Sequence, residues 1–298
     1  MGNVVPFPGG EDRHLVVGQQ ALAAKDYASA AAHLDKAYAE QPTFETARLL
    51  VQALDGLQAA NDALPYIGRH IESFLKTTAD QQLMIDTLVA VPDYRSAWAI
   101  THYFEQAMQQ QAQTQIAAAE TKDLQRHADV IDDLRKRVAH LGGLAFHEQE
   151  ALLSELGRLP KSVALQAIPP LLVDVDVHAA IRVSLLDALT AFSTDQPVDF
   201  RSYIGVKSVV PDALTGVMND QTITQMVQQA STLITDADER EATLEMLRLE
   251  LGFLYPFVAE SIPDQTAFVE GFVHHEHGVD PELEDWLENQ IAALINQA

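Results

Sequence analysis

The chain has 298 residues, 47% of them apolar, and its 43 acidic residues outnumber 19 basic residues to give a formal charge of −24. This length allows two compact domains or one continuous array, and the apolar content argues against global disorder. The absence of cysteine excludes disulfides, thiolate nucleophiles and cysteine-based metal sites. Nucleic acids and anionic membranes require clustered basic side chains, so we expect neither as a partner.

The first ten residues contain two prolines and three glycines, and they predict a flexible leader over 1–10. The opening lacks the basic start and continuous apolar run of a signal peptide. No apolar run approaches the roughly 18 residues that span a bilayer. We therefore expect a cytoplasmic protein.

A spacing of small and large side chains over 17–42 recurs further along the chain. Its anchor positions, Tyr27, Ala60 and Tyr94, are separated by 33 and then 34 residues. A single helical pair cannot bury its apolar face, so this repetition predicts stacked pairs. The pattern places the first pair at 11–24 and 27–41.

The residues within 17–42 resemble one tetratricopeptide repeat (TPR) unit. The matching positions are Gly18, Ala21, Tyr27, Ala30, Leu34, Ala37 and Pro42. In this family, small side chains let two antiparallel helices approach closely, and larger ones fill the space between units. The resemblance covers three units over 11–107. It implies an all-α fold, a TPR-like right-handed α-solenoid, that binds a protein or peptide.

The second predicted pair covers 44–57 and 60–75, and a third unit begins near Asp80. Asp93 is the expected N-cap of the helix that follows Pro92.

A helical pattern then continues to the glycine pair at 142–143, the expected C-cap. We predict that 108–141 is a long connecting helix, or two helices broken near 121–123. Its apolar stripe leaves open the alternative that this segment pairs with a second copy in a homodimer.

Short helices are expected at 147–157, 161–173 and 177–192, within a helical region over 142–195. The last of them is similar to the second helix of a HEAT-type repeat, with apolar side chains inward and Arg182 outward.

Alternating apolar and polar residues in 196–212 predict a small inserted β-hairpin that turns at Gly205. An isolated hairpin is marginal in water, so it must lie against helices. An acidic helical region follows over 213–298. Its predicted helices cover 220–234, 237–257, 264–273 and 280–297, with Asp280 as the last N-cap.

From Asp236 to the end the chain holds 15 acidic and two basic residues, for a local charge of −13. We interpret this region as a solvated surface that aids solubility. The alternative is a docking face for a basic partner.

The run His274-His275-Glu276-His277 is the densest group of potential metal ligands. Imidazoles and a carboxylate can hold zinc or nickel, but a chelating i, i+4 histidine pair is missing. We predict a surface loop there, with no metal and no cofactor. Phosphate-binding loops and nucleophile motifs are absent from the sequence, so we expect no enzyme. A metal-dependent enzyme using the C-terminal half is the alternative.

Partner binding in TPR proteins usually involves the first helix of each pair. The polar positions that the resemblance places on the concave face are Gln19, Arg48, Gln52, Gln82 and Asp86. Only Arg48 is basic, which does not favour clamping a peptide carboxylate. The predicted function is a non-catalytic scaffold or adaptor for a protein or peptide, with a self-assembling structural protein as a further alternative.

Overall fold

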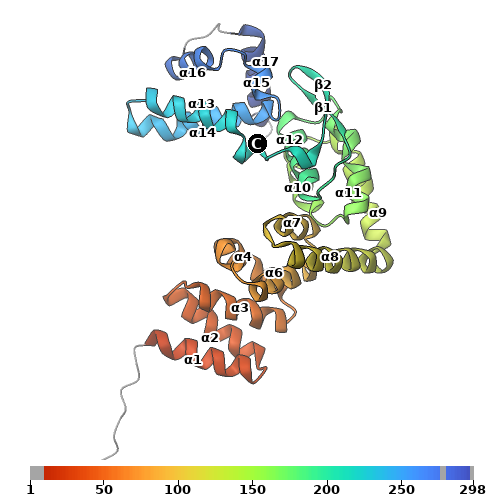
Figure 1. Ribbon diagram of the computed structural model, residues 1–298, viewed down its shortest axis with the longest axis vertical. Helices are drawn as coiled ribbons and strands as arrows, with labels where there is room; N and C mark the ends of the chain where they lie inside the picture. The colour runs from red at the N-terminus through yellow and green to blue at the C-terminus, as the bar shows by residue number, and fades with distance from the viewer. Residues whose placement is uncertain (1–9, 276–279, 296–298) are drawn as a thin grey trace, which may run out of the picture. The chain divides into compact units, whose positions relative to one another are not determined.

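The protein is mostly helical, at 76%. A computed structural model describes residues 10–275 and 280–295, which form seventeen α-helices and one antiparallel two-stranded hairpin (Figure 1). This confirms the predicted helical class and the hairpin. The chain divides into two compact units, Met1–Lys122 and Asp123–Ala298.

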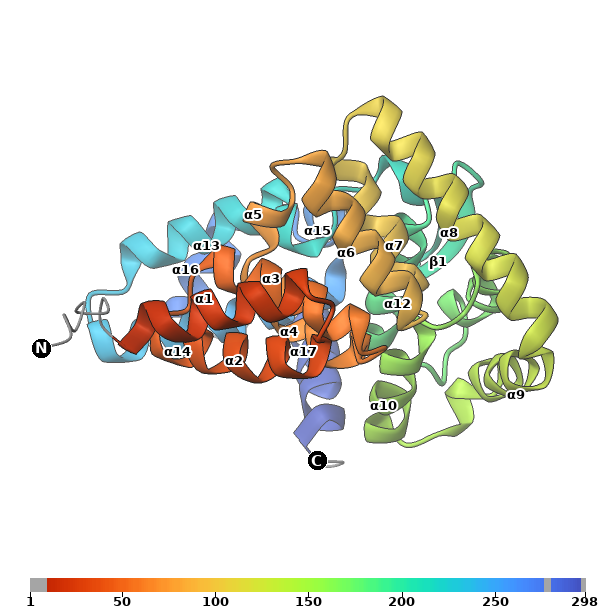
Figure 2. The ribbon, with the colours of Figure 1, turned by 90° about the horizontal axis from the view of Figure 1, so that it is seen from below.

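In the N-terminal unit, α1 packs on α2, α2 on α3, α3 on α4, and α4 on α6 (Figure 1, Figure 2). The helices are α1 (Gly10–Ala23), α2 (Tyr27–Glu40), α3 (Phe44–Gly56), α4 (Ala60–Arg69), α5 (Ile71–Phe74), α6 (Thr78–Ala90), α7 (Tyr94–Ile100) and α8 (Gln106–Arg126). The first three begin and end close to the predicted positions. The helix predicted over 60–75 is divided at His70 into α4 and α5.

Short polar side chains begin several of these helices. Asp26 accepts a hydrogen bond from the Ser29 N–H at 3.1 Å, and Asp93 accepts one from the Ser96 N–H at 3.2 Å. Each bond satisfies an N–H that has no partner within the helix, which stabilises the helix by about 1 kcal/mol. The N-cap predicted at Asp93 is confirmed.

Two glycines lie where helices of this unit approach each other closely. A Cβ added at Gly18 of α1 would lie 2.7 Å from Cγ of Leu34 in α2, and one at Gly56 of α3 would lie 2.4 Å from the Tyr27 ring of α2. Leu34 is fully buried, so it has little room to move away. The absence of a side chain at these positions therefore allows α1 and α3 to pack tightly on α2.

In the C-terminal unit, α9 packs on α10 and α11, and α12 packs on α10 and α14. The helices are α9 (Ala128–Ala139), α10 (Phe146–Leu156), α11 (Lys161–Ala167), α12 (Ala179–Ala191), α13 (Gln221–Leu233), α14 (Ala237–Leu254), α15 (Val258–Ser261), α16 (Gln265–His274) and α17 (Pro281–Ile295). The N-cap predicted at Asp280 is confirmed, because its carboxylate accepts from the Leu283 N–H at 3.1 Å.

The segment 108–141 is the broken one of its two predicted forms. α8 ends at Arg126 and α9 begins at Ala128, so the break falls at His127, just beyond the expected place. α9 then stops at Ala139, before the glycine pair at 142–143 that was the expected C-cap. The glycines instead end a short 3₁₀ turn. The boundary between the two compact units also falls inside this segment.

The hairpin predicted in 196–212 is confirmed. Strands β1 (Val198–Ser202) and β2 (Gly205–Val209) are antiparallel, with Ser202 opposite Gly205. The turn therefore consists of the two residues before Gly205. Gly205 has a φ of 101°, a conformation that favours glycine.

The hairpin lies against α12, and a buried arginine joins the two. The sequence pattern places Arg182 outward, and this is wrong, because the side chain is only 6% exposed. Its Nε donates to the Arg201 carbonyl of β1 at 3.2 Å, and its Nη1 donates to the carbonyls of Asp174, at 3.0 Å, and of Val177. One guanidinium can satisfy several carbonyls at once, which is why this charged side chain turns inward.

Apolar side chains of α13, α14, α16 and α17 form a continuous core. Leu247 and Leu251 of α14 and Val269 of α16 are fully buried within it, and Leu287 of α17 is 3% exposed. This shared core fixes α14, α16 and α17 relative to one another.

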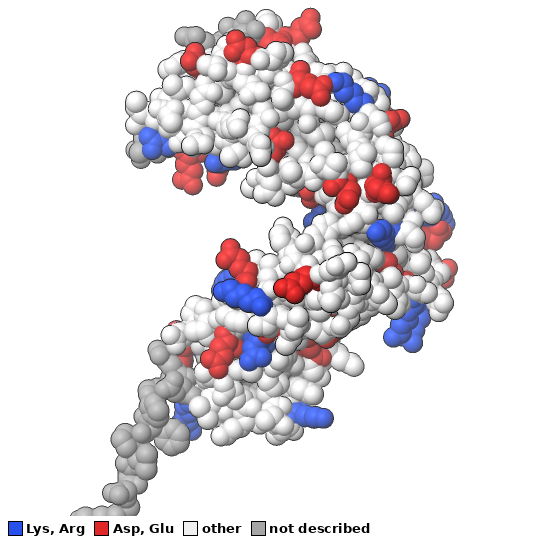
Figure 3. Space-filling model, viewed as in Figure 1, with Lys and Arg blue, Asp and Glu red and all other residues white. Residues whose placement is uncertain are grey.

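On the face drawn in Figure 3, acidic and basic side chains are interspersed over each unit. In α9, for example, Asp132 pairs with both Arg135 and Lys136, at 2.6 and 2.7 Å. Exposed pairs of this kind contribute about 0–1 kcal/mol each, so the fold depends on its apolar cores instead. No helix in the described ranges is long and apolar enough to cross a bilayer.

The close approach at Gly18 predicts opposite effects of alanine at two helical glycines. Gly18→Ala is expected to lower the free energy of unfolding by about 1–2 kcal/mol, because overpacking against Leu34 outweighs a gain of roughly 1 kcal/mol in helix propensity. In Gly68→Ala of α4 the added Cβ meets nothing within 4 Å, so only the stabilising gain remains. Urea unfolding monitored by circular dichroism measures both, and a stabilised Gly18→Ala protein contradicts the tight packing.

Candidate functional site

The five residues predicted to bind a partner lie on three helices that pack in order. Gln19 is on α1, Arg48 and Gln52 are on α3, and Gln82 and Asp86 are on α6. α1 packs on α3, and α3 packs on α6. The structure therefore places all five on neighbouring helices. We call these five residues the polar row.

Side-chain contacts connect the polar row from one helix to the next. Gln19 Nε2 donates to Glu45 Oε1 of α3 at 3.4 Å, and Arg48 Nε lies 3.8 Å from Asp80 Oδ1 of α6. Gln52 is half-buried and makes no side-chain hydrogen bond within the part of the chain that the structure describes. The contacts at Gln19 and Arg48 are long and therefore weak. Both side chains can exchange them for other hydrogen-bond partners at little cost in free energy.

A tighter network surrounds Gln82 and Asp86. Gln82 Nε2 donates to Asp86 Oδ1 at 2.8 Å and to Gln115 Oε1 of α8 at 2.7 Å. Gln111 Nε2 donates to Gln82 Oε1 at 2.9 Å, and Gln115 Nε2 donates to Asp86 Oδ1 at 2.7 Å. Gln82 and Asp86, one turn apart on α6, thus bond to Gln111 and Gln115, one turn apart on α8, and each pair holds the other in place.

Gln111 and Gln115 are not among the residues selected from the sequence, although they extend the polar surface onto α8. The sequence feature that could have indicated them is the glutamine- and alanine-rich stretch over 106–119, which has few large apolar side chains. A helix of that composition packs through small and amide groups. The partner of each amide is set by tertiary contacts that periodicity does not show.

A cavity of about 500 Å³ adjoins this network, lined by Asp55, Gln58, Ala60, Asn61, Asp86 and Ala90. Burial raises the pKa of the Asp55 carboxyl, an effect opposed by hydrogen bonds from the Thr87 hydroxyl and reinforced by the nearby Asp86. The Thr87 hydroxyl lies 3.1 and 2.9 Å from the two Asp55 oxygens. The α6 end of the polar row therefore borders an acidic cavity.

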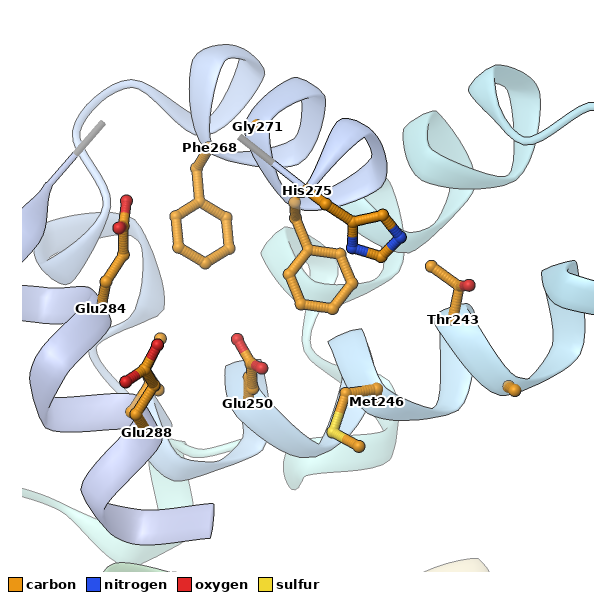
Figure 4. A pocket seen from close by; sticks show the side chains of 11 residues that line it. Thr243, Met246, Glu250, Phe268, Gly271, His275, Glu284 and Glu288 are labelled. Carbon is orange, nitrogen blue, oxygen red and sulfur yellow. The ribbon is translucent and has the colours of Figure 1, made fainter. Parts of the chain in front are cut away.

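The C-terminal unit contains another cavity, of about 430 Å³, which we call the acidic pocket. Figure 4 shows the Phe268 ring on one wall, across from Glu250 of α14, with Glu284 and Glu288 entering from α17. The lining residues are Ala242, Thr243, Met246, Glu250, Phe268, Gly271, Phe272, His275, Glu284, Leu287 and Glu288. The walls are thus largely apolar, with carboxylates at one side.

The electrostatics of the acidic pocket are unusual at Glu250. Burial, reinforced by the nearby Glu288, raises the pKa of the Glu250 carboxyl to about 7. Neither carboxylate pairs with a cationic side chain among the described residues. This combination suits a ligand with an apolar body and one positively charged group, which would lower that pKa again.

Within residues 10–275 and 280–295, no group of three or more His, Asp or Glu side chains is placed to hold a metal ion. His274 ends α16, and His275 caps it with a φ of 54°. Both side chains are exposed. Glu276 and His277 lie outside the described residues, so the surface loop expected over 274–277 stays a prediction.

Comparisons with protein-family models, with curated proteins and with solved structures gave no match for this chain. The TPR resemblance over 11–107 therefore stays a prediction from the sequence.

The raised pKa of Glu250 predicts a pH-dependent gain in stability for Glu250→Gln. A carboxyl whose folded pKa lies above its unfolded value of 4.5 destabilises the folded state once it ionises. This cost is absent below about pH 4.5, grows as the pH rises toward 7, and is complete above that. Glu250→Gln is therefore expected to gain about 2 kcal/mol over the wild type at about pH 8, and almost nothing at about pH 4.

Urea unfolding at several pH values measures this difference. The matched control is Glu245→Gln, which removes one charge from an exposed position of the same helix. Equal gains for the two variants at high pH would show that net charge, and not burial in the acidic pocket, is the cause.

Proposed function

We propose that the protein is a non-catalytic scaffold or adaptor whose N-terminal unit is a TPR-like α-solenoid that binds a protein or peptide. The succession of α1 and α2 by α3 and α4 supports this proposal, as does the close approach at Gly18. The direct packing of α1 on α3 and of α3 on α6 is also expected of first helices that line one side of a stacked array.

The polar row is the observation that carries the proposal. Its residues come from three successive first helices, and side-chain contacts link each helix to the next. Polar side chains on the outer face of a single helix can each be solvated on their own. A connected strip of amides and charges across several helices instead forms one surface long enough to contact an extended segment.

The chemistry of the polar row indicates what it recognises. The Gln52 amide of the row and the neighbouring Gln111 amide offer both donors and acceptors, which match the alternating N–H and C=O groups of a peptide backbone. Both N–H groups of Gln82 are already used by Asp86 and Gln115. Arg48 is the one cation in the row and already lies near Asp80. Recognition therefore depends on hydrogen bonds to backbone and polar groups, with little contribution from a terminal carboxylate.

The acidic pocket favours a second binding function in the C-terminal unit. Its apolar walls and its Glu250 and Glu288 carboxylates complement a segment in which a lysine or arginine is flanked by apolar residues. The local charge of −13 from Asp236 onward attracts such a segment over a longer range.

The two alternatives from the sequence have direct tests. A metal-dependent enzyme in the C-terminal half predicts stoichiometric metal in the purified protein, lost on His274→Ala. A self-assembling protein predicts a dimer by light scattering at tens of micromolar, formed through 108–141.

The scaffold proposal predicts that a partner captured by the full chain loses affinity when the polar row is changed. Capture from a lysate of the source cells, at low and at high salt, identifies the partner, and calorimetry measures binding of its minimal segment. The variant Arg48→Ala/Gln52→Ala/Gln82→Ala is expected to weaken that binding about tenfold or more, because a few central residues carry most interface energy.

A matched control changes three exposed residues on the second helices of the pairs, as Lys36→Ala/Glu40→Ala/Asp62→Ala. This variant should bind as the wild type does. Binding that both triple variants retain in full would refute the assignment to the polar row. A partner that is released by salt and depends on Glu250 and Glu288 would place recognition in the acidic pocket instead.

A further inference from the structure

A buried arginine in the C-terminal unit has one nitrogen left for a ligand. The Arg182 side chain is only 6% exposed, and its Nε and Nη1 donate to three backbone carbonyls. Its Nη2 has no acceptor within the described residues. Arg182 lines a cavity, so this nitrogen is available to a molecule that enters it.

A second guanidinium shares the same cavity. Arg201 of β1 donates from Nε to the Val173 carbonyl at 2.8 Å, and neither of its Nη atoms has an acceptor in the described part of the chain. Burial and the charge of Arg201 together lower the pKa of Arg182 to about 10, against the opposing effect of Asp174. The two cations are thus close enough to repel each other.

The charges of the whole chain make this pair of arginines unusual. With 43 acidic and 19 basic residues, most cations have a carboxylate available, and several on this unit use one. Arg182 and Arg201 take no part in the ion pairs of the described residues. Two close guanidinium groups without a paired carboxylate are most stable when an anion lies between them.

The cavity has a volume of about 530 Å³ and is formed by α10, the segment before α12, the hairpin and α17. Gln149 of α10 fixes the segment before α12, because its side-chain amide donates to the Asp176 carbonyl at 3.3 Å and accepts from the His178 N–H at 3.4 Å. The rings of Tyr203 and Trp286 form an aromatic wall, with centroids 5.6 Å apart. The Asp176 carboxylate also lines the cavity, so it disfavours an anion there.

We propose that this cavity binds a small organic oxyanion, a carboxylate or phosphoryl group held by Arg182 and Arg201, with its apolar part against Tyr203 and Trp286. Two guanidinium groups supply paired donors in the geometry that such oxygens accept. The volume exceeds that of a bare anion and matches sites for small molecules. This site is separate from the polar row and from the acidic pocket, and it does not depend on the scaffold proposal.

Titration of the full chain with inorganic phosphate and with acetate, at constant ionic strength kept with chloride, tests the proposal by backbone amide NMR shifts. The wild type is expected to bind at least one probe saturably. Arg201→Gln should weaken that binding about tenfold, and Asp176→Asn should strengthen it several-fold by removing repulsion. Arg248→Gln, which removes an exposed arginine from the same unit, should leave it unchanged.

The preferred probe identifies the ligand class, phosphoryl or carboxylate. The proposal is overturned if neither probe saturates, or if Arg201→Gln and Asp176→Asn both bind as the wild type does. Arg182 is left intact in this design because it holds the hairpin, whereas the half-buried Arg201 can be replaced with a smaller effect on folding. Circular dichroism of each variant confirms that it is folded.

Discussion

The N-terminal unit depends on how closely α1 and α3 approach α2. Gly18 lies against Leu34, and Gly56 lies against Tyr27, at distances that exclude a side chain at either glycine. Because both helices are held on the same neighbour, α1 and α3 also contact each other. That contact is what brings Gln19 within hydrogen-bond distance of Glu45. The position of the polar row is thus a consequence of core packing, and no dedicated loop is needed to build it.

The C-terminal unit solves a different problem, that of stabilising a two-stranded hairpin. A hairpin alone buries too little to persist, so β1 must pack on other elements. Its Phe200 is almost fully buried, and the Arg182 guanidinium of α12 bonds the Arg201 carbonyl in the same strand. Arg201 in turn bonds the Val173 carbonyl. The two arginines thereby hold the strand and the segment before α12 together, and this same arrangement brings their remaining nitrogens to one cavity.

Much of the helical layout could be predicted from local signals. The N-caps at Asp93 and Asp280 follow from short side chains that compete with the backbone at helix starts, and the hairpin follows from strict alternation. Features that depend on long-range contacts could not be predicted. Periodicity assigns a charged residue to the surface, so it misplaces Arg182, whose carbonyl partners come from β1 and from the segment before α12. The pairing of Gln111 with Gln82 has the same origin.

Electrostatics explain how one chain can hold sites for ligands of opposite charge. A net charge of −24 repels anions at long range, but at physiological salt its influence decays over about 8 Å. Inside a cavity, nearby groups act through a lower effective dielectric constant and dominate the local potential. Arg182 and Arg201 therefore set the potential of their cavity, and Glu250 and Glu288 set that of the acidic pocket. The surrounding charge changes how fast each ligand arrives, whereas the buried groups decide which ligand stays bound.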